Sequence, residues 1–170
     1  AYFNIGDFNS AAKNYNLYLS DKKENTDRAL LFRIGYVQME TGDNAKAIES
    51  FKNVALISDT LGYVSSYYLG NLYIKQDNKN YALAAYKTAK DDVPDKVLQE
   101  DSQFQYAKLN LDLGYFDEAI NAISDYQRKY PDSKRTENID EILTIAYLNA
   151  KNYDVALRHI ESMKTRSATI

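Results

Sequence analysis

Few side chains in this 170-residue sequence have the type or the spacing that catalysis requires. Cysteine is absent, so the chain has no thiol nucleophile, no disulfide and no thiolate metal site. The single histidine, His159, stands beside Arg158 and Ile160 without a partner nucleophile, and we interpret it as a surface or hydrogen-bonded residue. The 16 tyrosines offer hydroxyls but no base to activate them. We therefore expect no enzymatic activity, no metal site and no cofactor.

The charged segments and the lack of phosphate-binding motifs give no sign of a metal, nucleotide or nucleic-acid site either. The acidic segment 91–95 lacks the twelve-residue spacing and the glycine of an EF-hand loop, so we expect it to form a solvated turn that caps the next helix. The basic pair Lys134-Arg135 is interpreted as ordinary loop charge. Neither glycine-rich nucleotide motif is present, and a net charge of −3 gives no basic footprint for nucleic acid.

The elements that position these side chains are predicted to be helices. Only two prolines and six glycines are present, too few for the many tight turns of an all-β fold. The longest apolar runs, such as Ala29-Leu30-Leu31-Phe32, are far shorter than the roughly 18–20 residues that a membrane-spanning helix needs. We expect no transmembrane segment.

Five segments repeat at a spacing of 35 to 37 residues. Each begins at a turn residue, has an alanine five positions later, and has a large apolar residue four positions beyond that alanine. The turn residues are Gly6, Gly42, Asp77, Gly114 and Lys151; the alanines are Ala11, Ala47, Ala82, Ala119 and Ala156; the large residues are Tyr15, Phe51, Tyr86, Ile123 and Ile160. Both prolines, Pro94 and Pro131, follow the alanine of their own repeat by twelve residues.

Each repeat is predicted to be an antiparallel helix pair. The turn residue ends the first helix in a left-handed conformation, the alanine lets two helices approach closely, and proline ends the second helix. First helices are predicted at 27–41, 62–76, 96–113 and 134–150, and second helices at 8–20, 44–58, 79–91, 116–130 and 153–165.

The pattern resembles the tetratricopeptide repeat (TPR) family over essentially the whole chain. The third repeat carries it most clearly, with Leu69-Gly70, Tyr73, Asp77, Ala82, Tyr86, Ala89 and Pro94 in order. The family's tryptophan is absent from every repeat, and the fifth repeat has Thr144 where glycine or alanine is usual. The resemblance implies an all-α fold, a right-handed α-solenoid of antiparallel helix pairs, with residues 1–170 forming a single array of about four and a half repeats.

A finer resemblance concerns one junction and the location of the protein. The segment Tyr130-Pro131-Asp132-Ser133 is similar to a junction common in envelope TPR proteins of Gram-negative bacteria. It favours the periplasm or cell envelope over the cytoplasm. The first repeat lacks most of its first helix and no capping helix follows the last, so we expect a fragment of a longer array; the alternative is self-association that covers the bare ends.

In such a solenoid the first helices line the concave face. The resemblance therefore implies an apolar and aromatic groove for a peptide or protein partner, with isolated polar points. The predicted groove residues are Phe32, Tyr36, Met39, Tyr67, Asn71, Ile74, Phe104, Lys108 and Leu111, with Phe3, Ile145 and Leu148 on the same side. Only Asn71 and Lys108 fall where the family's chaperone-tail clamp has several basic and amide residues, which argues against that ligand.

Three hypotheses follow from these patterns. The leading one is a non-enzymatic scaffold that binds a peptide or protein partner in the groove. The alternative is a structural or assembly element that self-associates through its groove or its uncapped ends, as a homo-oligomer. The third, an enzyme or its regulatory arm, requires a further domain in the parent chain. Individual groove residues could also pack between repeats without meeting any partner.

Overall fold

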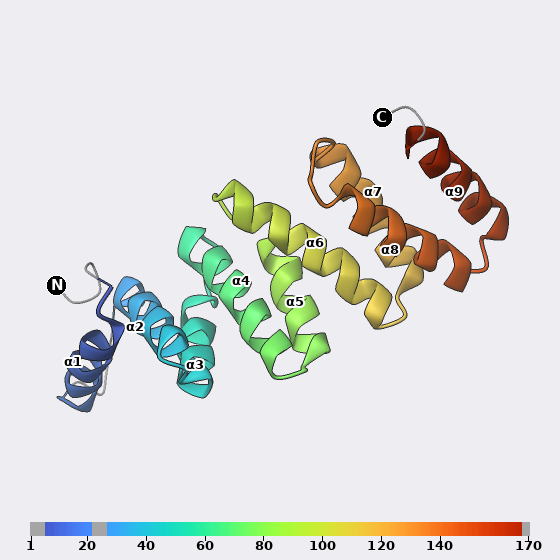
Figure 1. Ribbon diagram of the computed structural model, residues 1–170. Coiled ribbons are helices and arrows are strands. Elements are labelled where there is room, and N and C mark those ends of the chain that lie inside the picture. Colours follow the sequence, from blue (N-terminus) through green and yellow to red (C-terminus); the bar gives the residue numbers. More distant parts are fainter. Residues whose placement is uncertain (1–5, 22–26, 168–170) are drawn as a thin grey trace. The chain divides into compact units, whose positions relative to one another are not determined.

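The structure is a computed structural model that describes residues 6–21 and 27–167, and within these ranges it contains nine α-helices and no strand (Figure 1). The helices are α1 (Phe8–Asp21), α2 (Arg28–Glu40), α3 (Asn44–Val54), α4 (Thr60–Lys75), α5 (Lys79–Ala89), α6 (Lys96–Asp112), α7 (Phe116–Lys129), α8 (Thr136–Asn149) and α9 (Tyr153–Ser167). The predicted all-α solenoid is confirmed. One predicted boundary is wrong by four residues, because α3 ends at Val54 and the chain then turns toward Asp59, which caps α4.

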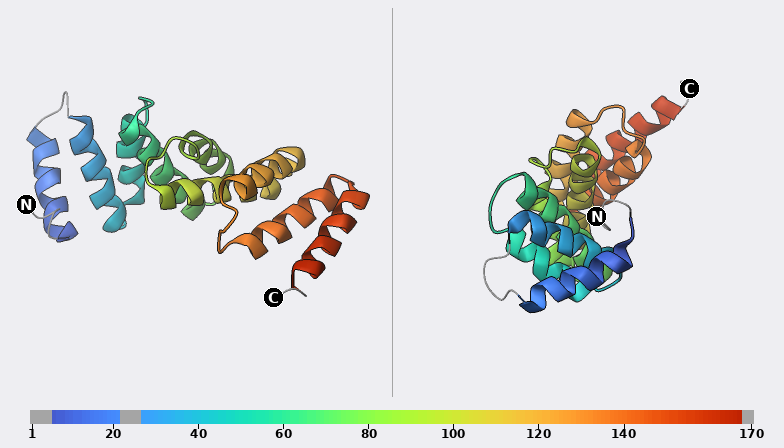
Figure 2. Two further views of the ribbon diagram at one scale, coloured as in Figure 1. Left: turned by 90° about the horizontal axis from the view of Figure 1, so that it is seen from above. Right: turned by 90° about the vertical axis from the view of Figure 1, so that its left-hand side faces the viewer.

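The chain divides into two compact units, Ala1–Pro94 and Asp95–Ile170, which we call unit 1 and unit 2. In unit 1, α1 packs on α2, α2 on α3, α3 on α4 and α4 on α5, and α2 also touches α4. In unit 2, α6 packs on α7, α7 on α8 and α8 on α9, and α6 also touches α8. Consecutive helices within a unit run in opposite directions (Figure 2). The prediction of one continuous array over residues 1–170 stays a prediction.

The turns between the helices of a pair confirm the repeat. All five predicted turn residues have positive φ: 75° at Gly6, 83° at Gly42, 54° at Asp77, 81° at Gly114 and 61° at Lys151. At the last four of these turns the same two backbone bonds close the helix, with N···O distances of 2.8–3.1 Å. The turn residue donates to the carbonyl three positions back, and the next residue donates to the carbonyl five positions back. This bonding satisfies carbonyls that a helix end would otherwise leave unpaired.

Small residues and large ones meet where the two helices of a pair cross. All five repeat alanines are at most 3% exposed. On the facing helix, a Cβ added to Gly70 would lie 2.7 Å from the Tyr86 ring, and one added to Gly35 would lie 3.1 Å from the Phe51 ring. The aromatic residue four positions after the alanine therefore fills space that a glycine on the first helix leaves open.

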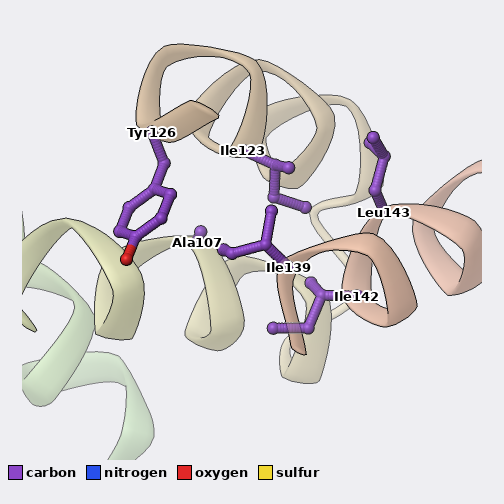
Figure 3. Packing of buried hydrophobic residues seen from close by; sticks show 6 residues of the cluster. All are labelled: Ala107, Ile123, Tyr126, Ile139, Ile142 and Leu143. Carbon is purple, nitrogen blue, oxygen red and sulfur yellow. The ribbon is translucent and has the colours of Figure 1, made fainter. Parts of the chain in front are cut away.

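Each unit has its own apolar core. In unit 1 it is formed by Ala47, Phe51, Leu69 and Leu72. In unit 2 the core residues are Ala107 from α6, Ile123 and Tyr126 from α7, and Ile139, Ile142 and Leu143 from α8 (Figure 3). The ring of Tyr126 extends from α7 so that its hydroxyl points toward α6 (Figure 3).

Candidate interaction surfaces

Six of the predicted groove residues lie in unit 1 on α2 and α4, the first helices of two successive pairs that touch each other. On each helix they recur at i, i+4 and i+7, so they share one face of it. Ile74 is 40% exposed. The other five, Phe32, Tyr36, Met39, Tyr67 and Asn71, are half-buried. We call these six residues the α2–α4 surface.

Tyr68 organises this surface, and the sequence analysis did not identify it. Its ring stacks on Phe51 with a centroid distance of 5.4 Å and meets Tyr36 edge-on at 5.6 Å. It also contacts Tyr67 at 5.4 Å and Phe32 at 6.1 Å. These distances and tilts are typical of favourable aromatic pairs. The half-buried rings are therefore held by core packing on one side.

Asn71 has a partner within its own unit. Its side-chain oxygen accepts a hydrogen bond of 2.5 Å from the Tyr86 hydroxyl. Tyr86 is the aromatic residue that packs on Gly70, and it is 1% exposed. The amide of Asn71 thus satisfies the polar end of a buried ring, a role that the sequence analysis did not foresee.

The other predicted residues that the structure describes lie in unit 2. On α6, Phe104 and Leu111 are half-buried against the core, and Lys108 is exposed. Phe104 lies under the guanidinium of Arg135, with 4.7 Å from Cζ to the ring centroid. On α8, Ile145 and Leu148 are 39% and 45% exposed. Phe3 lies outside the described residues.

In unit 1 an ion pair fastens the turn between α3 and α4. Arg28 on α2 donates from Nη1 and Nη2 to the two carboxylate oxygens of Asp59, at 2.7 and 3.0 Å. Its Nη2 also donates to the carbonyl of Val54 at the end of α3, at 2.8 Å. The hydrogen bonds from Arg28, followed by that from the Gly62 amide, lower the pKa of Asp59 from 3.8 to about 2.

In unit 2 a carboxylate fastens the turn between α7 and α8. Glu100 on α6 accepts hydrogen bonds of 2.6 Å from both Ser133 and Tyr126, whose oxygens are 2.7 Å apart. The bond from Ser133, then that from Tyr126, lowers the pKa of Glu100. Burial, and then the bond to Glu100, raises the pKa of Tyr126 from 10.0 to about 12.

Arg135 takes part in the same junction, so interpreting Lys134-Arg135 as ordinary loop charge was wrong for this residue. Its Nη2 lies 2.7 Å from Oδ1 of Asp101 on α6. Together with its position over Phe104, this ion pair ties the start of α8 to α6. The acidic residues on α6, one helix pair earlier in the sequence, are the only hint of this ion pair. Only the fold brings them close to Arg135.

No described residues form an acidic, histidine or cysteine cluster that could hold a metal ion. In the segment 91–95, Asp95 caps α6 by accepting bonds from the amides of Val97 at 2.9 Å and Leu98 at 3.1 Å, as predicted. None of the helices in the described ranges has the length and apolar character needed to cross a membrane.

Comparison with known proteins gives a family model and structural neighbours. Residues 29–56 and 65–96 match the tetratricopeptide repeat model. A search of curated protein sequences gives no match.

Among solved structures the chain is similar to the MamA protein, with 24% identity, a TM-score of 0.69, and coverage of 94% of this chain and 82% of that one. A structure of MamA AMB-1 has 17% identity and a TM-score of 0.72 over 99% of this chain and 87% of that one. A tetratricopeptide repeat protein from Parabacteroides merdae ATCC 43184 has 20% identity and a TM-score of 0.55 over 96% of this chain and 60% of that one. At these identities the likeness concerns the fold.

Proposed function

Since this chain belongs to the tetratricopeptide repeat family, whose folds serve as scaffolds for protein interactions, we propose that it is a non-enzymatic scaffold that binds a peptide or protein segment on the α2–α4 surface. The observation that carries the proposal is the apolar and aromatic character of two adjacent first helices whose rings are only half-buried.

The physical argument rests on how these rings are held. Packing around Tyr68 fixes the side chains of Phe32, Tyr36 and Tyr67, so a partner does not have to order them on binding. Tyrosine and phenylalanine also bury a large area for few rotatable bonds. The exposed end of the surface, at Ile74, offers an apolar side chain that contributes affinity when it is covered. Lys108 and Leu111 on α6, with Phe104, are proposed as contacts of unit 2 with a partner.

The test uses charge introduced at exposed apolar positions. Ile74→Glu places a carboxylate on the α2–α4 surface, and because the side chain is 40% exposed the fold should be kept. Leu17→Glu is the matched control, since Leu17 is 66% exposed on α1, a second helix. Proteins captured from a lysate of the source cells by the wild type and by Leu17→Glu should be lost with Ile74→Glu, and circular dichroism should show equal helix content. Equal capture by all three would exclude the α2–α4 surface as the binding site.

Self-assembly is the second candidate, and the last described helix favours it. On α9, Tyr153 is 62% exposed and Leu157 is 58% exposed, so this helix presents two large apolar side chains to solvent. A second copy of the chain could cover them. Light scattering should then show an oligomer that dissociates in Leu157→Glu; a wild-type monomer at millimolar concentration would exclude this role.

We also propose that the protein belongs to a bacterial cell envelope. The support is the Tyr130-Pro131-Asp132-Ser133 junction, in which Ser133 anchors the turn to Glu100. Fractionation of the source cells, with detection by an antibody, tests the location; recovery in the cytoplasm alone would contradict it.

A further inference from the structure

Unit 2 contains a cavity of about 240 Å³ where α7 ends and α8 begins, which is not part of the α2–α4 surface. Tyr126 of α7 and Ile139 of α8, two core residues that are each 1% exposed, form its inner part (Figure 3). Pro131 lies at its exposed end. The cavity therefore extends from the core of unit 2 to its surface. The lining residues are Tyr126, Gln127, Tyr130, Pro131, Thr136 and Ile139.

Two tyrosine rings form adjoining walls of this cavity. The ring centroids of Tyr126 and Tyr130 are 5.1 Å apart, and their planes are inclined by 50°. The aliphatic side chain of Ile139 and the ring of Pro131 complete the apolar lining. A third ring that enters such a space can pack edge-on or offset against the tyrosines, which are the arrangements that aromatic pairs favour.

The polar groups of the lining are engaged within unit 2. The hydroxyl of Tyr126 bonds Glu100 at 2.6 Å, and that of Thr136 donates to a backbone carbonyl of the preceding turn at 2.6 Å. The side-chain amide of Gln127 donates to Asp140 at 3.2 Å. These bonds hold the walls in place before any ligand arrives. None of the six lining residues is charged, so the cavity favours an uncharged apolar group over one that has to give up its hydration.

The volume limits how large that group can be. An apolar cavity of roughly 150 Å³ holds a benzene molecule. Pockets for whole small-molecule ligands ordinarily have about 300–1,000 Å³. The cavity in unit 2 lies between these sizes, so it has room for one single or fused ring and little more. Aromatic side chains that fill such pockets supply much of the affinity in protein interfaces.

We propose that the cavity at the α7–α8 junction is an anchor site for one uncharged aromatic side chain, that of tryptophan or phenylalanine, from a partner protein. The ring packs against Tyr126, Tyr130 and Ile139, and the backbone of the partner stays outside, beside Pro131. Because all lining residues belong to unit 2, binding at this site does not require the α2–α4 surface.

The test uses N-acetyl-L-tryptophanamide, an uncharged probe that carries the indole ring, and the full chain with ¹³C-labelled isoleucine methyl groups. In NMR titrations the ring current of the indole should shift the methyl signals of Ile139, with a Kd of about 1 mM for a group of this size. N-acetyl-L-leucinamide should bind roughly three- to tenfold more weakly, because it cannot form aromatic pairs. Ile139 signals that stay in place at tens of millimolar probe would overturn the proposal, and equal affinity for the two probes would overturn its aromatic specificity.

Variants then locate the binding. Thr136→Phe fills the cavity with a ring of its own and should raise the Kd about tenfold or more. Asn138→Phe is the matched control, since Asn138 is exposed two residues further along α8 and does not line the cavity. Wild-type affinity in a Thr136→Phe variant with unchanged helix content would contradict the proposed site.

A second pair of variants decides the matter if Thr136→Phe does not fold. Tyr130→Leu removes one aromatic wall of the cavity, whereas Tyr130→Phe keeps the ring. Only the leucine variant should bind N-acetyl-L-tryptophanamide more weakly than the wild type. Equal affinity of both variants would exclude the ring of Tyr130, and with it this cavity, as the anchor site.

Discussion

Side chains of the preceding first helix fasten the turn between α3 and α4 in unit 1 and the turn between α7 and α8 in unit 2. The two fastenings place their charges in opposite order. Arg28 and Glu100 occupy the same place on their helices, each seven residues before the small residue at Gly35 or Ala107. In unit 1 the cation is on the first helix and the acid, Asp59, precedes the next helix. In unit 2 acids are on the first helix and the cation, Arg135, precedes the next helix.

This difference shows that the repeat determines the position at which a side chain must hold the turn. It does not determine whether that side chain is a cation or an acid. The turn between two helix pairs is not held to the preceding first helix by regular backbone hydrogen bonds, so side chains must connect the two. A bidentate arginine does so in unit 1, and a carboxylate with two hydroxyl donors does so in unit 2.

The strongest way to break the comparison is to reverse one charge. Arg28→Glu places a carboxylate beside Asp59 and leaves the Val54 carbonyl without its donor, so we expect the largest loss of stability, confined to unit 1. The measurement is the urea midpoint, with hydrogen exchange to show which helices open.

The double variant Arg28→Glu/Asp59→Arg transplants the charge order of unit 2 into unit 1. If the two positions are equivalent, it should recover part of the lost stability. A double variant as unstable as the sum of its single changes would show that the two positions are not interchangeable.

In unit 2 the corresponding change is Tyr126→Phe. It removes one donor from Glu100 and keeps the ring that fills the core, so we expect a loss of about 1–2 kcal/mol. Denaturant unfolding measures it. Tyr130→Phe, a half-buried ring on the same turn whose hydroxyl does not bond Glu100 in the described structure, is the control for loss of a hydroxyl. A loss in Tyr126→Phe no larger than in the control would contradict the role of Glu100.

The pH dependence should separate the two fastenings at alkaline pH. Asp59 has its pKa lowered from 3.8 to about 2, so its contribution is complete above pH 4 and is lost as the pH falls toward 2. Glu100 also has a lowered pKa, so unit 2 weakens in acid as well. Tyr126 has its pKa raised from 10.0 to about 12, so the fastening of unit 2 should lose stability as the pH rises from 10 to 12, whereas the bonds of Arg28 to Asp59 and Val54 in unit 1 involve no tyrosine. Burial also raises the pKa of Tyr73 in unit 1, so the comparison with Tyr126→Phe isolates the contribution of Tyr126. Thermal melting across these ranges tests it, and Tyr126→Phe should lose less stability than the wild type between pH 10 and pH 12.

The smallest effects concern the turns within the pairs, where the two units also differ. Lys151→Gly relieves a side chain held at φ 61° and should stabilise unit 2 by about 1 kcal/mol. Asp77→Gly should gain less in unit 1, since aspartate tolerates the left-handed region better. Thermal melting of both variants gives the comparison; destabilisation by Lys151→Gly would show that the lysine side chain contributes more than its strained backbone costs.

Much of the fold could be predicted from the sequence because its determinants are local. A left-handed turn, an alanine five positions later and a large apolar or aromatic residue one helical turn beyond it lie within ten residues of each other. Backbone sterics and the helical period connect them. All five turns therefore have positive φ, including those at Asp77 and Lys151, where no glycine marks the place.

The contacts that shape the surfaces were determined only by the tertiary structure. Tyr68, Arg28 with Asp59, and Glu100 with Ser133 each gain their role from a partner on another helix or in the turn before one. In the sequence they are an aromatic residue among many and charges like any others, because their partners are set by how helices pack and not by spacing along one helix. The sequence by itself determined a stack of helix pairs and the faces that they bury; the packing decided which polar and aromatic side chains hold the pairs together and which remain for a partner.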